Sequence, residues 1–199
     1  MNSPYDYIVT PVEQRYDNVK KIGNRSLILN SQIESFKSVS KLAKVVSIPL
    51  AYNLDIEIGD LVYIHHNVFR RFYNMKGKQQ NSRSYFKEDL YFCSPDQIYL
   101  YKHDKEIKAF LDRCFIKPLL SSKLEKKLQE NKGIVKYSNS ILEKSGIKKG
   151  DIVSFPSLRN WEFIVENELL YCMKSKDILI KHECKGNEKE YNPSWAYSS

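Results

Sequence analysis

The chain of 199 residues lacks the short motifs by which most enzymes are recognised. It has only 7 glycines, and neither of the phosphate-binding loops G-x-G-x-x-G and G-x-x-x-x-G-K-[ST] occurs. The sequences G-x-S-x-G and H-E-x-x-H are also absent. No apolar run approaches the roughly 20 residues that span a bilayer. We therefore expect a protein that is not an enzyme, needs no cofactor and does not bind a membrane.

Signals for secretion and for metal binding are equally scarce. Residues 1–7 lack the basic and apolar regions of a signal peptide, so we expect a cytoplasmic protein. The four cysteines show no C-x-x-C spacing. Cys93 and Cys172 fall at similar places in two expected strands, where a reducing compartment favours buried free thiols over a disulfide. His65 and His66 would face opposite sides of a continuing strand, so we expect no metal site there.

The sequence does contain a copy of itself. Residues 56–64 read I-E-I-G-D-L-V-Y-I, and residues 147–155 read I-K-K-G-D-I-V-S-F. In each copy a Gly-Asp pair, which favours a tight turn, precedes an alternating apolar run that predicts a strand. Five blocks match in the same order, which predicts a duplicated domain. The other matched blocks are 7–11 with 114–118, 44–47 with 133–136, 89–93 with 168–172, and 96–100 with 176–180.

A polar segment in the first half, residues 13–31, ends near a compact apolar triplet. Two interpretations are open: a short strand inside the core, or a tethered segment that becomes ordered when its apolar side chains dock in a partner's groove. The second half has no such triplet. The triplet consists of Leu27, Ile28 and Leu29. The segment also contains the pair Gly23-Asn24, which interrupts any regular secondary structure.

Residues 65–87 mix basic and aromatic side chains and are expected to form an elaborated hairpin. Such a mixture, led here by Arg70, Arg71 and Lys78, can follow a phosphate backbone and stack bases. A solvated charged face is the simpler interpretation. The net charge of +8 is spread over the chain, because residues 1–112 carry 16 basic and 13 acidic side chains and the remainder 16 and 11. We therefore do not expect nucleic acid as the main partner.

In combination the blocks resemble the GroES family of co-chaperonins, and within it the divergent co-chaperonins of tailed bacteriophages. The matching features are an N-terminal strand, an apolar triplet after a long loop, a strand of the type V-x-x-[VI], and the sequence I-x-x-GD-x-V-x-[IF]. The most specific part lies in residues 162–180 and includes E-x-x-L-L-Y-C-M-x-S-x-D-I-L-I. The resemblance covers about 90% of the chain as two copies.

This resemblance implies an all-β fold with two GroES-like irregular antiparallel β-barrels in tandem. The implied function is a co-chaperonin that caps a GroEL-type chaperonin ring and assists ATP-dependent folding of a client, for example a phage capsid protein. A homo-oligomeric ring, favoured as a heptamer, would dock through Leu27, Ile28 and Leu29, with Gly23 and Asn24 keeping a mobile loop flexible. A structural or virion-associated protein that reuses the fold is the alternative. The expected parts are repeat 1 (1–105, with the loop at about 13–31 and the hairpin at about 65–87), a connector (106–112), repeat 2 without a recognisable loop (113–182) and a C-terminal tail (183–199).

Overall fold

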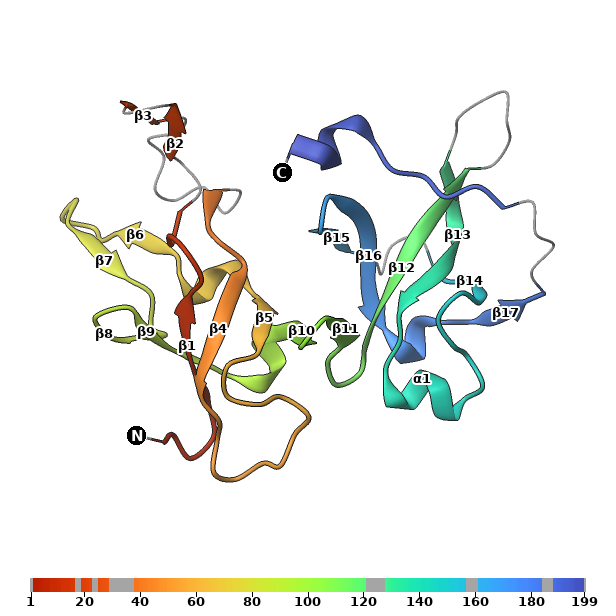
Figure 1. Ribbon diagram of the computed structural model, residues 1–199, viewed down its shortest axis with the longest axis horizontal. Coiled ribbons are helices and arrows are strands. Elements are labelled where there is room, and N and C mark those ends of the chain that lie inside the picture. Colours follow the sequence, from red (N-terminus) through yellow and green to blue (C-terminus); the bar gives the residue numbers. More distant parts are fainter. Residues whose placement is uncertain are drawn as a thin grey trace. The chain divides into compact units, whose positions relative to one another are not determined.

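The computed structural model describes residues 2–16, 19–22, 25–28, 38–120, 128–156, 161–183 and 188–198. These residues form antiparallel sheets and a few short helices, which confirms the all-β class. The chain divides into two compact units, Met1–Ile107 and Lys108–Ser199, each with its own main sheet (Figure 1). Within the described ranges, no helix is long and apolar enough to cross a bilayer.

The first unit is built on a seven-stranded sheet with the order β11-β10-β5-β4-β1-β9-β8. Its strands follow the apolar alternation of the sequence: β5, for example, buries Val62 and Ile64 completely and leaves Leu61 and Tyr63 partly exposed. The strands are β1 (Tyr7–Pro11), β4 (Leu42–Ser47), β5 (Leu61–Ile64), β8 (Tyr85–Lys87), β9 (Leu90–Cys93), β10 (Ile98–His103) and β11 (Glu106–Ala109).

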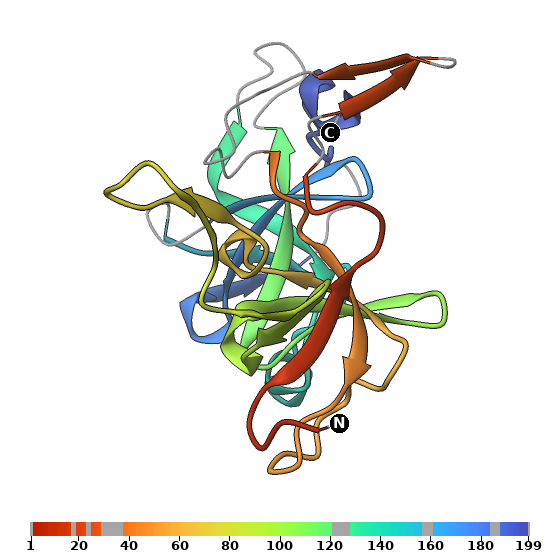
Figure 2. The same ribbon diagram turned by 90° about the vertical axis from the view of Figure 1, so that its left-hand side faces the viewer.

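Two hairpins and two short 3-10 helices complete the first unit. Each hairpin is a two-stranded antiparallel sheet, and neither is joined to the main sheet by any pairing of described residues. Figure 2 shows the olive-yellow β6–β7 hairpin as a separate ribbon of this unit. The hairpins are β2 (Val19–Ile22) with β3 (Arg25–Ile28) and β6 (Arg71–Tyr73) with β7 (Gln79–Asn81); the helices are η2 (His66–Val68) and η3 (Pro95–Gln97).

The second unit has a six-stranded sheet with the order β15-β16-β12-β13-β14-β17. Its core includes Ile116, Val135, Val153 and Phe155, all almost completely buried. The strands are β12 (Arg113–Leu120), β13 (Leu128–Tyr137), β14 (Ile152–Ser154), β15 (Trp161–Val165), β16 (Glu168–Lys174) and β17 (Ile180–His182), and the helices are α1 (Ser140–Lys144), η5 (Ser175–Asp177) and η6 (Ser194–Ser198).

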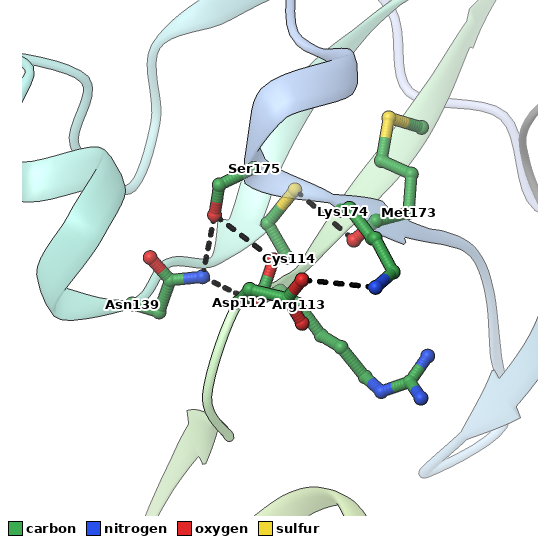
Figure 3. Close-up of polar contacts among 7 residues, drawn as sticks. All are labelled: Asp112, Arg113, Cys114, Asn139, Met173, Lys174 and Ser175. Atoms are coloured by element: carbon green, nitrogen blue, oxygen red, sulfur yellow. Dashed lines mark hydrogen bonds and ion pairs between the residues drawn. The ribbon is translucent and has the colours of Figure 1, made fainter. Parts of the chain in front are cut away.

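Asn139 joins three parts of the second unit (Figure 3). As the N-cap of α1, its side-chain oxygen accepts a hydrogen bond of 2.9 Å from the amide of Leu142. Its side-chain nitrogen donates to the carbonyl oxygen of Arg113, at the start of β12, and to the hydroxyl of Ser175 at 2.7 Å. One buried side chain therefore ties the helix to β12 and to the turn after β16.

The two main sheets repeat one another strand by strand. The order β10-β5-β4-β1-β9-β8 of the first sheet matches the order β17-β14-β13-β12-β16-β15 of the second. The first strands also share a register irregularity, between Ile8 and Val9 in β1 and between Phe115 and Ile116 in β12. The duplication seen in the sequence is thus also a duplication of strand order.

The two Gly-Asp turns match down to single hydrogen bonds. The amide of Val45 donates to the Asp60 carbonyl, and its own carbonyl accepts from Gly59, both at 2.9 Å. Around Gly150-Asp151 the amide and carbonyl of Val135 make the same two bonds, at 2.9 and 2.8 Å. Each glycine has a positive φ, 100° and 92°, which glycine adopts without the strain a Cβ would cause. Backbone geometry therefore explains why Gly-Asp occurs twice.

The expected barrels are not closed in the described part of the chain. Among the described strands neither main sheet closes on itself: β11 and β8 are the edges of the first, and β15 and β17 the edges of the second. The connector expected at 106–112 is a strand over Glu106–Ala109 that lies beside β10. The reversal before it uses Asp104 with φ 52°, a left-handed conformation that a short polar side chain tolerates. The residues expected as a connector thus include a strand that forms a hairpin with β10.

The expected equivalence of Cys93 and Cys172 is wrong by one residue. Tyr7 pairs with Cys93, whereas Cys114, the counterpart of Tyr7 in β12, pairs with Met173. Met173 is therefore the residue that corresponds to Cys93. Both predicted thiols are nevertheless free and buried, as expected.

Candidate functional site

Two residues of the predicted docking triplet lie in the β2–β3 hairpin. Leu27 and Ile28 lie in β3, while Leu29 and the pair Gly23-Asn24 lie outside the described residues. In the antiparallel register, Leu27 is opposite Lys20 and Ile28 is opposite Val19. The sequence left open whether the triplet forms a short strand in the core or a tethered docking segment. In the structure β3 is a strand, but it pairs with β2 in a separate sheet rather than with the main sheet of the first unit.

The segment that carries this hairpin begins and ends at one place, which we call the neck: Arg15, Tyr16, Val39 and Ser40. Tyr16 and Val39 form an antiparallel bridge and are 8% and 2% exposed. The amide of Ser40 donates to the carbonyl oxygen of Arg15 at 2.9 Å. The backbone on either side of this segment is therefore paired, and two of its side chains, Tyr16 and Val39, are buried.

Arg15 fastens the neck to residues 69–87, the part of the basic and aromatic segment 65–87 that we call the insertion. Its Nη2 and Nε donate to the carbonyl oxygen of Phe69 at 2.8 and 3.2 Å. Its Nη1 donates to Oδ1 of Asn81 in β7 at 2.9 Å. The guanidinium also lies 4.9 Å from the ring centre of Tyr91, at cation–π distance. Burial lowers the pKa of Arg15, and the charge of the Tyr91 phenol group when ionised partly opposes this effect.

Tyr16 makes a second connection between the neck and the β6–β7 hairpin. Its hydroxyl oxygen accepts a hydrogen bond of 2.6 Å from the amide of Arg71, the first residue of β6. The Arg71 guanidinium in turn lies 5.8 Å from the centre of the Tyr16 ring. Because both neck residues contact this hairpin, the part of the chain next to the docking segment is supported by the 69–87 insertion.

The adjacent histidines do not lie as the sequence predicted. Strand β5 ends at Ile64, and His65 caps η2 instead, accepting a hydrogen bond from the amide of Asn67 at 3.1 Å. The two imidazole rings are therefore stacked, 4.3 Å apart, and not on opposite faces. Burial, then the neighbouring His65 and Arg70, lower the pKa of His66 to about 4. In the described part of the chain no three His, Cys, Asp or Glu side chains gather as metal ligands.

The second unit closes the position that corresponds to the neck. Leu120 pairs with Leu128, so only residues 121–127 lie between the paired strands. The backbone of residues 189–191 then hydrogen-bonds along residues 118–120, including a bridge at Leu119. The C-terminal tail thus packs back on its own unit. The tail pairs with the end of β12, directly before residues 121–127.

The second unit contains a buried basic side chain, Lys117, that forms an ion pair with Glu168. Lys117, 2% exposed, lies 3.4 Å from Glu168, and Lys136 lies 2.8 Å from the other oxygen of the same carboxylate. Burial acts to raise the pKa of Glu168, but the hydrogen bond from Lys136 and the charge of Lys117 outweigh it, and the pKa is lowered. The carboxylate balances the charges of the two lysines, so we assign these three side chains a structural role.

The sequence indicated the triplet but not the neck. Arg15 and Tyr16 fall inside the segment 13–31 that was expected to be a loop, and Asn81 has no distinguishing neighbours. One signal was present: Tyr16 is a lone aromatic residue in a polar stretch, and such rings usually cover a surface. The part of the predicted loop before residue 17 is therefore anchored backbone.

Arg15 and Tyr16 thus anchor the backbone that leads into the β2–β3 hairpin. Both strands of the β2–β3 hairpin lack a pairing with any further described strand, which leaves their outer edges able to accept one. No protein-family model matches the chain, and no curated protein sequence matches it. We therefore infer the binding partner from the geometry of the β2–β3 hairpin and from the sequence resemblance.

Proposed function

We propose that the protein is a co-chaperonin that binds a GroEL-type chaperonin ring through the β2–β3 hairpin and Leu27, Ile28 and Leu29. The observation that carries this proposal is the placement of β3 in a separate two-stranded sheet whose chain ends meet at the buried neck. A hairpin of two strands is marginally stable alone in water. A partner groove that takes up apolar side chains or adds a strand would complete it.

The strand order of the two units supports the same proposal. Both main sheets repeat one topology, as expected for two copies of one domain. We take each sheet as an open form of the GroES-like barrel. In this proposal only the first copy docks, because in the second copy only residues 121–127 separate the paired strands and the C-terminal tail pairs with residues 118–120 beside them.

The proposed assembly is a homo-oligomeric ring. Each chain presents one docking segment, so a ring of seven chains would match a sevenfold chaperonin. Each contact would be weak because binding orders the segment, and several contacts on one ring would raise the effective concentration enough to hold the cap. Hydrolysis of ATP would belong to the chaperonin, and the client, such as a phage capsid protein, would fold inside the closed chamber.

The test is binding of the purified full-length chain to a GroEL-type chaperonin in the presence of ATP, measured by sedimentation. The wild type is compared with the variant Leu27→Ser, Ile28→Ser, Leu29→Ser. The matched control carries Leu50→Ser, Ile58→Ser and Leu179→Ser, which lie outside the hairpin and are 68%, 65% and 65% exposed. Circular dichroism and thermal unfolding establish that each variant is folded.

Saturable binding by the wild type and the control, lost in the hairpin variant, is the expected result. Equal binding by all three proteins would remove the docking role of the triplet. If the folded wild type binds none of several chaperonins, the protein instead reuses the fold in a structural or virion-associated role.

A further inference from the structure

One stretch of the first unit carries basic side chains without any acidic ones. Residues 61–87 contain six Lys and Arg side chains and no Asp or Glu, in a chain whose net charge is +8. A count by halves hides this because acidic residues such as Glu88 and Asp89 follow immediately. In the structure this stretch forms β5, η2, the β6–β7 hairpin and β8.

Most of these charges are on the surface. Lys76 and Lys78 are exposed at the turn of the β6–β7 hairpin, and Arg83 and Lys87 are exposed just after it. No acidic side chain lies within this stretch to neutralise them. The hairpin is therefore suited to a polyanion, whose phosphates would replace the missing counter-charges.

Two aromatic rings accompany the cations. Phe72 and Tyr73 in β6 are 38% and 48% exposed, unlike the completely buried Phe69 that precedes them. They are three to six positions from Lys76 and Lys78 in sequence, and the two cations lie in the turn that joins β6 to β7. Exposed rings next to cations can stack on unpaired bases while the cations contact phosphates.

The hairpin is ordered before any ligand arrives. The side-chain oxygen of Asn74 accepts hydrogen bonds from the amides of Lys76 and Lys78 at 3.0 and 2.9 Å, which fixes the turn. At the other end, Asn81 is held by Arg15, and the hydroxyl of the next residue, Ser82, donates to a carbonyl oxygen of η2 at 2.6 Å. A surface held at both ends loses little conformational entropy on binding.

We propose that the β6–β7 hairpin binds single-stranded nucleic acid, with Lys76 and Lys78 contacting phosphates and with Phe72 and Tyr73, which alternate between the two faces of the ribbon, each stacking on a base. The rings favour a single strand over a duplex, whose bases are already stacked on one another. They also favour a nucleic acid over an acidic protein surface, which would engage the cations but not require the rings. This binding is independent of chaperonin docking through β3.

The experiment is fluorescence anisotropy with labelled oligo(dT) and oligo(U) of about 20 nucleotides, a duplex of equal length and heparin, at several salt concentrations. A charge variant, Lys76→Glu with Lys78→Glu, is matched by Lys148→Glu with Lys149→Glu, an exposed pair in the second unit. A ring variant, Phe72→Ala with Tyr73→Ala, is matched by Tyr5→Ala with Tyr52→Ala, which are 62% and 45% exposed. Thermal unfolding checks that all five proteins are folded.

The wild type is expected to bind the single strands more tightly than the duplex. The charge variant should lose about tenfold or more in affinity at low salt and flatten the salt dependence by roughly 0.7 per lost phosphate contact. The ring variant should lose about fivefold or more with little change in salt dependence, because base stacking contributes about 1–3 kcal/mol per base. Both control variants should stay within about twofold of the wild type.

Three results would overturn the proposal. One is absence of single-strand binding by the wild type at about 50 mM salt. Another is an equal loss in the charge variant and its control, which would indicate a diffuse attraction of the whole chain. The third is an unaffected ring variant together with equal affinity for duplex and heparin, which would indicate a surface for any polyanion, including an acidic protein.

Discussion

The guanidinium of Arg15 donates two hydrogen bonds to the carbonyl oxygen of Phe69, a residue 54 positions further along the chain. This contact joins the base of the docking segment to the start of the basic and aromatic insertion. A planar fork suits it, because two nitrogens can converge on one carbonyl while a third reaches Asn81. The insertion therefore supports the neck in addition to presenting its own surface.

Replacement of Arg15 by Ala should destabilise the first unit. The change removes the donors to the Phe69 carbonyl and to Asn81 and the contact over Tyr91. We expect a loss of about 2 kcal/mol in the free energy of unfolding, measured by urea denaturation, because buried acceptors are left without donors. Arg15→Lys should lie between wild type and Ala, since it keeps the charge without the fork. An Ala variant as stable as the wild type would contradict the role of the neck.

Gly133→Ala should destabilise the second unit. A Cβ at Gly133 would lie 2.6 Å from the carbonyl oxygen of Lys117 and would also overlap the side chain of Ile116. Backbone and a packed β-branched side chain cannot move away cheaply, so we expect a loss of about 2 kcal/mol or more in thermal or urea unfolding. Ala43 holds the same register position in the first sheet and is fully buried there. Its replacement by Gly is the control, with an expected cost of about 1 kcal/mol from backbone entropy.

Asn139→Ala should also weaken the second unit, through hydrogen bonds rather than packing. The variant loses the cap on the amide of Leu142 and the donor to the Arg113 carbonyl and to Ser175. A lost cap costs about 1 kcal/mol and unpaired buried groups a further 1–2 kcal/mol, so we expect about 2–3 kcal/mol in urea unfolding. The exposed neighbour in α1, Ser140→Ala, should be nearly neutral. Equal effects of the two changes would argue against the Asn139 network.

The repeated sheets were predictable because their signals are local. Each Gly-Asp turn needs a positive φ at glycine and is followed by a strand whose buried residues alternate, so residues 56–64 and 147–155 could be matched from the sequence. The open edges of the sheets and the β10–β11 hairpin were not predictable in this way. Whether a sheet closes depends on the pairing of strands distant in sequence, and the turn at Asp104 requires a conformation that asparagine or glycine signals more clearly.

The one-residue error at Cys172 has a similar physical cause. In β9 buried and partly exposed residues alternate, but β16 is buried at five successive positions on both faces. A strand buried on both faces carries no alternation from which its register could be read. The neck was missed for a different reason: Arg15 and Asn81 acquire their role only when residues 66 positions apart meet.

The Asp residues of the two Gly-Asp turns are each paired with a cation from the end of the same unit. Oδ1 of Asp60 lies 2.8 Å from Nδ1 of His103, and Oδ2 of Asp151 lies 2.6 Å from Nζ of Lys181. The hydrogen bond to Asp60, and then its charge, raise the pKa of His103 above the ordinary value of 6.5. In the second turn a backbone hydrogen bond and the bond from Lys181 lower the pKa of Asp151 below 3.8.

The two turns should therefore respond to pH in opposite directions. Because the folded-state pKa of His103 is raised, its contribution to stability is complete below about pH 6.5 and is lost as the pH rises through the folded value. The wild-type first unit should accordingly unfold at lower temperature at about pH 9 than at about pH 6, and His103→Gln should reduce this difference. Because the pKa of Asp151 is lowered, Lys181→Met should destabilise the second unit at neutral pH, with the difference shrinking as the pH falls through the folded value below 3.8. Calorimetry across this range would contradict the assignment if His103→Gln left the alkaline loss unchanged.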